Sequence, residues 1–146
     1  SLQAHQKTVE ITEIQCVTLE SFAAAHTMSD GPCCLKIDVE NHEAAMLRGA
    51  KQFIHARRPW IACEILPCEE FDPATQTKHN NNRETLALVQ ELGYVPFAVT
   101  DDGFFRMTPA DFSRPRGLKD FLLAPQEKIP ADTSFLALEN VGELFK

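Results

Sequence analysis

The sequence predicts an α/β fold with a mostly parallel sheet, and residues 35–66 carry most of that prediction. Two short apolar runs, at residues 35–39 and 60–63, have the length and composition of buried strands. Between them, apolar side chains recur every three or four positions over residues 41–57, which is the spacing of one helix face. A strand, a helix and a second strand of this length form a parallel crossover unit, which is right-handed by default.

The chain has 146 residues, the size of a single domain, and we treat residues 1–146 as one. Its 44% hydrophobic and 24% charged content is typical of globular proteins. A formal net charge of −7 without a basic cluster argues against a nucleic-acid partner. The absence of a run of about 18 apolar residues argues against a membrane partner. Five cysteines without a C-x-x-C pair predict reduced, buried thiols in a cytoplasmic protein.

The elements before the crossover unit are short. Residues 8–18 alternate imperfectly between apolar and polar side chains, which suits one bent strand or two short ones. Residues 19–27 have the pattern of a short helix with Phe22 on its buried face. Turn-forming residues at 29–32 then lead into the strand at residues 34–39.

The ends of the central helix are marked by polar residues. Asn41 stands where the helix should begin, and its side chain can cap the first turn, in which Glu43 favours the positive helix end. Gly49 lies in the middle at a propensity cost of roughly 1 kcal/mol, which close packing on the sheet would justify. Arg57 and Arg58 complement the negative end of the same helix.

A long polar segment follows the second strand, at residues 67–82. Long loops at the carboxyl end of a strand are often functional, and a surface insertion without a function is the alternative. A second amphipathic helix is expected at residues 83–92, and Gly93 ends it.

Three further strands are expected after that helix. Residues 94–100 form the first, and Pro96 within it indicates an edge position. Residues 104–107 can pair back on this strand, and residues 120–124 form the last strand. Residues 126–146 are expected to be a tail that contains one short helix.

Asp38 and Glu64 each close one strand of the crossover unit. Ligands of open α/β sheets bind beyond the carboxyl ends of the strands, so two acids there suggest a site. We expect Asp38 to be a catalytic or metal-binding acid, and the pair to bind a divalent ion or deprotonate a hydroxyl. The structural alternatives are a carboxylate that holds backbone N–H groups for Asp38 and an ion pair, with Lys36 or an arginine, for Glu64.

Three neighbouring residues are weaker candidates. His42 can act as a catalytic base, although a histidine in the first turn of a helix is more often simply solvated. Glu40 can bind a ligand or favour the helix N-terminus, and Glu43 is expected to orient the turn rather than to react.

Several segments follow one another in a distinctive order: TLESF from Thr18, LKIDVENHEAAMLRGA from Leu35, RRPWIACEI from Arg57, ELGY from Glu91 and KDFLLAP from Lys119. Together they resemble the C-terminal part of an FkbM-type methyltransferase domain, over about residues 16–125. Glu20 replaces the family's usual Asp, and Asn41 replaces its usual Gly after Asp-Val-Glu. Asparagine tolerates a left-handed or capping backbone position, so the turn should survive.

The resemblance implies a Rossmann-like class I methyltransferase half-fold with three layers and a mostly parallel sheet, whose last two strands form an antiparallel edge pair. It also implies S-adenosylmethionine as the cofactor and a hydroxyl of a sugar or natural product as the small-molecule acceptor. We then expect Asp38, Val39 and Glu40 to contact the cofactor, and Asp38, Glu64 and His42 to form the catalytic group, in which Glu64 resembles the family's fifth-strand acid.

One element of such a fold is missing from the sequence. Dinucleotide-type folds hold their ligand on a glycine-rich turn after the first strand, but this chain has no G-x-G and only isolated glycines. We therefore expect the second half of the fold, inactive alone. The strand at residues 35–39 would then expose its edge, so we expect self-association there, or cover from residues 8–17.

Two other functions stay open at this stage. One is a non-catalytic binding or assembly module, because a fold alone does not fix a function. The other is a metal-assisted hydrolase that uses Asp38, Glu64 and His42.

Overall fold

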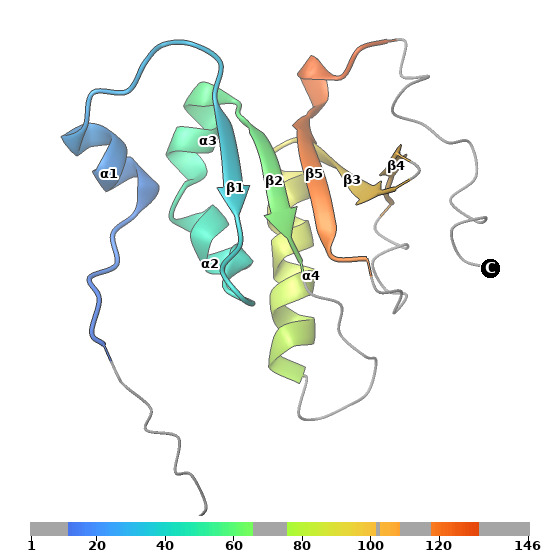
Figure 1. Ribbon diagram of the computed structural model, residues 1–146, viewed down its shortest axis with the longest axis horizontal. Helices are drawn as coiled ribbons and strands as arrows, with labels where there is room; N and C mark the ends of the chain where they lie inside the picture. Colours follow the sequence, from blue (N-terminus) through green and yellow to red (C-terminus); the bar gives the residue numbers. More distant parts are fainter. Residues whose placement is uncertain (1–11, 66–75, 102, 109–117, 132–146) are drawn as a thin grey trace, which may run out of the picture.

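The computed structural model describes residues 12–65, 76–101, 103–108 and 118–131, with the backbone alone for residues 76–80. They form a five-stranded sheet in the order β1-β2-β5-β3-β4 (Figure 1). The strands are Cys34–Ile37 (β1), Trp60–Glu64 (β2), Tyr94–Thr100 (β3), Gly103–Arg106 (β4) and Asp120–Pro125 (β5).

The crossover unit is confirmed. β1 and β2 pair in parallel, with Cys34 opposite Trp60 and Ile37 opposite Cys63. The two strands are therefore direct neighbours, and their carboxyl ends lie at the same edge of the sheet.

The expectation of a mostly parallel sheet is wrong. β5 pairs antiparallel with both β2 and β3, and β4 pairs antiparallel with β3. The antiparallel pairing of the strands at residues 94–100 and 120–124 is confirmed, but β5 lies inside the sheet and not at its edge. β5 runs opposite to its neighbours β2 and β3, and β4 folds back on β3, so every pairing except that of β1 with β2 is antiparallel.

The edge position expected from Pro96 is also wrong, since β3 has a neighbour on each side. The β3–β4 ladder begins with Phe97 opposite Arg106, and the Pro96 carbonyl accepts from the Met107 N–H at 2.9 Å. In an antiparallel pair the N–H and C=O of one residue point to the same side. The missing N–H of Pro96 thus falls at the end of that ladder, where its loss is tolerated.

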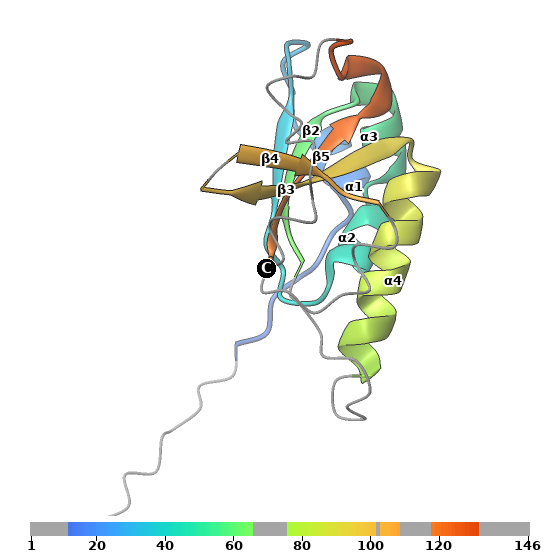
Figure 2. The ribbon, with the colours of Figure 1, turned by 90° about the vertical axis from the view of Figure 1, so that its right-hand side faces the viewer.

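The helices lie on one face of the sheet (Figures 1 and 2). They are α2 (Glu43–Arg48), α3 (Lys51–Arg57) and α4 (Gln76–Glu91), while α1 (Leu19–Ala25) packs beside α3 and a 3-10 turn η3 (Gln126–Lys128) follows β5. The described residues therefore form two layers, and the expected third layer is not among them.

The main core fills the space between the sheet and these helices. Its fully buried members include Ile37, Leu47, Ile54, Ile61, Val89 and Leu123. A smaller apolar group lies on the opposite face, where Val95, Phe97 and Ala124 are buried and Trp60 and Leu122 pack against them.

The single helix expected at residues 41–57 is two helices that meet at Gly49. A Cβ at Gly49 would make only ordinary contacts, with two carbonyl oxygens of its own helix and with the Thr18 methyl group at 3.7 Å. The Gly49 carbonyl accepts from the Leu19 N–H at 3.2 Å. Gly49 therefore faces the start of α1 and not the sheet, which corrects the packing expected for it.

The N-terminal expectations are met in part. Residues 12–17 form no strand and are exposed, whereas residues 8–11 lie outside the described residues, so the expected strand and its cover of β1 find no support. The expected helix is present as α1, where the Thr18 side chain accepts from the Ser21 N–H at 3.1 Å. It buries no residue, and Phe22 is 45% exposed.

Helix α4 begins earlier than expected, at Gln76 rather than Arg83. The seven added residues, QTKHNNN, are polar, so no apolar face announces them in the sequence. Residues 66–75 and 132–146, which include most of the expected loop and the tail helix, lie outside the described residues. No helix in the described ranges is both long and apolar enough to cross a membrane.

The expectation of buried cysteines holds for Cys63 alone among the thiols that the structure describes. Cys16 and Cys34 are exposed and Cys33 is half-buried, and none of these cysteines is in a disulfide. Burial raises the pKa of the Cys63 thiol to about 12, so this group stays protonated at neutral pH.

Candidate functional site

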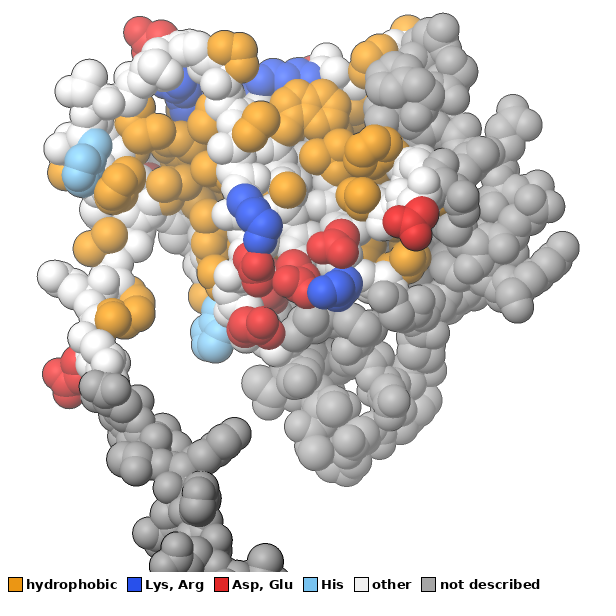
Figure 3. Space-filling view, in the orientation of Figure 1, with side chains coloured by type: hydrophobic (Ala, Val, Ile, Leu, Met, Phe, Trp, Pro, Cys, Tyr) orange, Lys and Arg blue, Asp and Glu red, His pale blue; other side chains and the backbone are white. Residues whose placement is uncertain are grey.

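The structure brings the two strand-end carboxylates together. Asp38 follows the last residue of β1, and Glu64 is the last residue of β2. The register pairs Ile37 with Cys63, so Asp38 comes next along β1 at the level of Glu64. On the other side of β2, Asp120 of β5 lies opposite Glu64. Figure 3, which views the sheet face opposite the helices, shows acidic and basic side chains gathered below a hydrophobic area.

Asp38 and Glu64 are each paired with a lysine. Lys36 Nζ lies 2.6 Å from Asp38 Oδ2, and Lys119 Nζ lies 3.0 Å from Glu64 Oε1. Glu64 is the more enclosed acid, with 19% of its side chain exposed against 42% for Asp38. The ion pair considered for Glu64 is therefore present, but its partner is Lys119, while Lys36 binds Asp38.

These ion pairs favour the charged forms of the side chains at the carboxyl end of β1 and β2. The hydrogen bond and the charge of Lys36 lower the pKa of Asp38, and Glu64 and Lys119 act in the same direction. The pKa of Lys36 is raised by its hydrogen bond to Asp38, and that of Lys119 by its hydrogen bond to Glu64. Asp38 is thus a carboxylate at neutral pH, a strong hydrogen-bond acceptor but a weak base.

An exposed loop of three residues, Asp38, Val39 and Glu40, leaves the sheet after β1. The two residues that end this turn, Glu40 (φ 48°) and Asn41 (φ 70°), are both left-handed, as expected for Asn41. The capping role expected for Asn41 is wrong, because His42 occupies the N-cap position of α2. We call residues 38–40 the 38–40 loop.

His42 holds this loop from outside. Its ring Nδ1 lies 3.2 Å from the carbonyl oxygens of both Val39 and Glu40, and the side chain is exposed. Among the described contacts it bonds neither Asp38 nor Glu64. The structure therefore places His42 beside the acid pair as a loop contact, and its role as a base stays a prediction.

The metal site predicted for Asp38 and Glu64 finds no support. The described part of the chain has no group of three or more His, Cys, Asp or Glu side chains that could hold a metal ion. Lysine ammonium groups already occupy the positions beside both carboxylates. The described donor set thus does not fit a divalent ion, and the metal-assisted hydrolase finds no support among the described residues.

Sequence reasoning considered Lys36 as a partner of Glu64 but missed its pair with Asp38, and it missed Lys119. Lys36 precedes Asp38 by two residues on a strand, so their side chains share one face, and this spacing could have predicted the pair. Lys119 reaches Glu64 only because β5 inserts beside β2. No local pattern in the sequence predicts that β5 inserts beside β2.

The opposite end of the sheet is closed by Arg58. Its guanidinium donates to the carbonyl oxygens of Leu92 at 2.6 Å and Gly93 at 3.1 Å, and it pairs with Glu127 at 2.6 Å. It also lies 4.7 Å from the centre of the Tyr94 ring. Arg58 thus ends its own helix as the C-cap residue, whose N–H donates to the Ile54 carbonyl, while its guanidinium caps the end of α4.

Arg57 lies in the last turn of α3, as expected, and its guanidinium bonds another segment. It donates to the carbonyl oxygens of Ser29 and Gly31 in the turn before β1.

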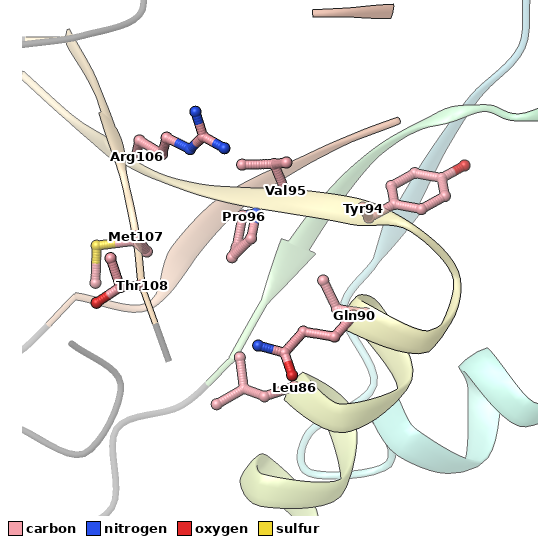
Figure 4. A pocket seen from close by; sticks show the side chains of 9 residues that line it. Leu86, Gln90, Tyr94, Val95, Pro96, Arg106, Met107 and Thr108 are labelled. Atoms are coloured by element: carbon pink, nitrogen blue, oxygen red, sulfur yellow. The ribbon is translucent and has the colours of Figure 1, made fainter. Parts of the chain in front are cut away.

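Two hollows lie away from the acid pair. One, of about 230 Å³ between α4 and the strands β3 and β4, is lined mainly by apolar side chains such as Leu86, Pro96 and Met107 (Figure 4). The other, of about 500 Å³, lies between the start of α1 and α2, beside Phe22 and Met46. Neither includes Asp38 or Glu64, so neither belongs to the carboxyl-end site.

Comparison with known proteins places this sequence in a family. The model of the methyltransferase FkbM domain matches residues 1–96, which starts earlier and ends earlier than the resemblance noted in the sequence. Searches of curated proteins and of solved structures found no match. The matched stretch contains β1, β2 and both strand-end carboxylates. Because 96 of the 146 residues match, this chain belongs to the FkbM methyltransferase domain family.

Proposed function

We propose that this chain acts in S-adenosylmethionine-dependent O-methylation and that the 38–40 loop is part of its active site. The observation that carries the proposal is the Asp38 carboxylate. It is exposed, held ionised by Lys36, and lies at the carboxyl end of β1 within the family match. This is the edge at which open α/β sheets bind their ligands.

The described residues fit one part of the cofactor. The 38–40 loop offers two carboxylates, which suit an amino group or a positively charged centre, and the 36% exposed side chain of Val39, which suits the face of an adenine ring. The sequence has no G-x-G turn that could hold the rest of the cofactor. We therefore propose that the other cofactor contacts come from another part of the active assembly, and that this chain alone binds the cofactor measurably through the 38–40 loop but does not transfer the methyl group.

When bound, S-adenosylmethionine supplies a methyl group on a positively charged sulfur. Asp38 accepts a hydrogen bond from the acceptor hydroxyl and orients its oxygen toward that methyl group. Because the pKa of Asp38 is lowered, its part is orientation and charge stabilisation more than strong base catalysis. The hydroxyl proton leaves toward the solvent at this exposed edge. Glu64, fixed by Lys119, holds the neighbouring strand end in place.

The acceptor proposed is a hydroxyl of a small molecule such as a sugar or natural product. Carboxylates and ammonium groups alternate along this edge, so it offers both acceptors and donors to a hydroxyl-rich ligand. A net charge of −7 and three acids at the same edge disfavour a phosphate-rich acceptor.

The test is calorimetric titration of the chain with S-adenosylmethionine and S-adenosylhomocysteine. Asp38→Asn should weaken binding about tenfold by loss of a charge-assisted contact. The matched control is Asp120→Asn, which removes an acid of the same edge outside the 38–40 loop and should leave affinity unchanged. A folded wild-type chain that binds neither ligand at millimolar concentration would contradict the proposal.

A non-catalytic assembly role is the second candidate, and one observation favours it. Among the described residues β1 pairs only with β2, so its outer edge is unpaired. In this role the edge would pair with the same edge of a second copy. Sedimentation equilibrium decides the matter, because a chain that stays monomeric at high concentration would contradict pairing through β1.

A further inference from the structure

We infer that Glu43 is a positioning residue, whose buried carboxylate ties the 38–40 loop to helix α4 through Asn41 and Asn81. The inference rests on the proposed function, because the 38–40 loop is the segment proposed to hold cofactor and acceptor. It adds α4, an element remote in sequence, to the parts that set the geometry of the site.

The burial of Glu43 calls for a specific reason. Only 1% of this residue is exposed, although it stands in the first turn of a helix, where a glutamate ordinarily faces water. Burial of a carboxylate costs several kcal/mol unless hydrogen bonds or charges offset it. Among the described side chains no ion pair involves Glu43. Hydrogen bonds must therefore offset the cost of burying the Glu43 carboxylate.

The two oxygens of Glu43 reach two different elements. Oε1 accepts from the backbone N–H of Asn41 at 3.0 Å, and Oε2 accepts from the side-chain Nδ2 of Asn81 at 2.8 Å. Asn81 belongs to α4, which packs against α2. One rigid carboxylate thus links the turn after β1 with a helix 38 residues further along the chain.

The turn that Glu43 holds is strained. Glu40 and Asn41 adopt a left-handed backbone in succession, which is unfavourable for Glu40 and better tolerated by Asn41. The Asn41 N–H, fixed by Glu43, keeps the second of these residues in place. Without this bond the turn loses its main inner support, and the three residues before Asn41 are free to shift. His42 remains as a contact on the exposed side only.

The neighbourhood of the bridge supplies a control. Thr85 lies one turn after Asn81 on α4 and is fully buried, and its hydroxyl has no hydrogen-bond partner among the described atoms. Thr85→Val keeps the shape of this side chain and removes only that hydroxyl. It therefore perturbs the same buried surface without touching the bridge.

The bridge can be tested without any ligand, by hydrogen exchange of the Asn41 amide measured by NMR. Asn81→Ala, which lies far from Asn41 in sequence, should speed this exchange at least about tenfold because Glu43 loses its second anchor. Thr85→Val should leave the exchange unchanged. If Asn81→Ala leaves the Asn41 amide as protected as in the wild type, the bridge does not exist and the inference is wrong.

An exchange of hydrogen-bonding groups separates positioning from mere stability. In Asn81→Asp the new carboxylate faces the Glu43 carboxylate, so neither side chain can donate and the bond to α4 is lost. The double variant Glu43→Gln with Asn81→Asp restores a donor at residue 43 opposite an acceptor at residue 81, and it should recover both Asn41 protection and affinity for S-adenosylmethionine. Recovery of the melting temperature without recovery of affinity would make Glu43 structural only and overturn the inference.

The two proposals fail in distinguishable ways. If the wild type binds no cofactor while the Asn41 exchange responds as expected, the proposed function fails and the bridge stands. If the wild type binds cofactor and the single variants leave both readouts unchanged, the bridge fails and the proposed function stands.

Discussion

The two ends of the sheet are built in opposite ways. At the carboxyl end of β1 and β2, each carboxylate has one exposed lysine as its ion-pair partner. At the other end, Arg58 combines two backbone carbonyls, the Glu127 carboxylate and the face of Tyr94 in one contact network.

This difference suggests that the Arg58 end stabilises the fold, while the carboxyl end of β1 and β2 is the one suited to bind a ligand. The Arg58 network joins the ends of α3, α4 and η3, and four of the five guanidinium N–H groups already donate to described residues. Exposed ion pairs contribute little to stability, and a ligand can displace one partner at low cost. The carboxyl end is therefore the end at which groups remain available, and the predictions below test this contrast.

The largest effect is expected from Arg58→Ala. The change leaves the carbonyls of Leu92 and Gly93 without their donor and removes the contact with Tyr94. The free energy of unfolding should therefore fall by about 2–4 kcal/mol. Urea denaturation followed by circular dichroism measures this. Arg57→Ala, which removes bonds to a turn at the surface, is the matched control, and an equal loss there would break the contrast.

A somewhat smaller loss of stability is expected from changes at Tyr94, the single tyrosine of the chain. Its hydroxyl donates to the Pro59 carbonyl at 2.8 Å, and burial raises its pKa to about 12 from an ordinary value of 10. Since the folded state favours the protonated phenol, this stabilisation is complete below pH 10 and is lost as the pH rises toward 12.

Absorbance at 295 nm follows that titration without interference from a second tyrosine. Tyr94→Phe leaves a buried acceptor unpaired and should cost about 1–2 kcal/mol at neutral pH. A tyrosine that titrates near pH 10 in the folded protein would show that the network is open to water.

Glu127 should contribute less to stability than Tyr94, and its contribution should be lost at low pH instead of high pH. The hydrogen bond from Arg58 lowers the pKa of Glu127 from 4.5 to about 2. Its contribution is present above pH 4.5 and is lost as the pH falls toward 2. More than half of the Glu127 side chain is exposed, so solvent screens this term. Glu127→Gln should flatten the acid limb of a stability–pH curve, and an unchanged curve would contradict this role.

The smallest effect on stability is expected at the carboxyl end. Lys36→Ala removes an exposed ion pair and should leave the denaturation midpoint unchanged, while the pKa of Asp38 rises toward its ordinary range. NMR titration of the Asp38 carboxyl carbon reports the second change. A marked loss of stability would mean that this end is as essential to the fold as the Arg58 network.

The parts that the sequence predicted are those whose signals are local. Asp38 and Glu64 stand directly after apolar runs, and the strand–helix–strand pattern places both at one edge. The left-handed position of Asn41 likewise follows from the residue itself and its neighbours.

The parts that it did not predict depend on distant pairings. The run at residues 120–124 shows that a strand forms, but nothing in it shows that this strand inserts between β2 and β3. The partners of Arg58 lie more than 30 residues away, and the hydrogen bond between Glu43 and Asn81 spans 38 residues. The early start of α4 was missed because its first residues are polar and show no periodicity.

The position of β5 also has a consequence for the order in which the chain is made. Translation delivers β1 and β2, then β3 and β4, and only afterwards the strand that joins them. Until residues 120–125 leave the ribosome, the nascent chain holds two small sheets with four open edges, whereas the finished sheet has two. Open edges of this kind recruit other strands. The newborn protein is therefore most exposed to aggregation just before synthesis reaches β5.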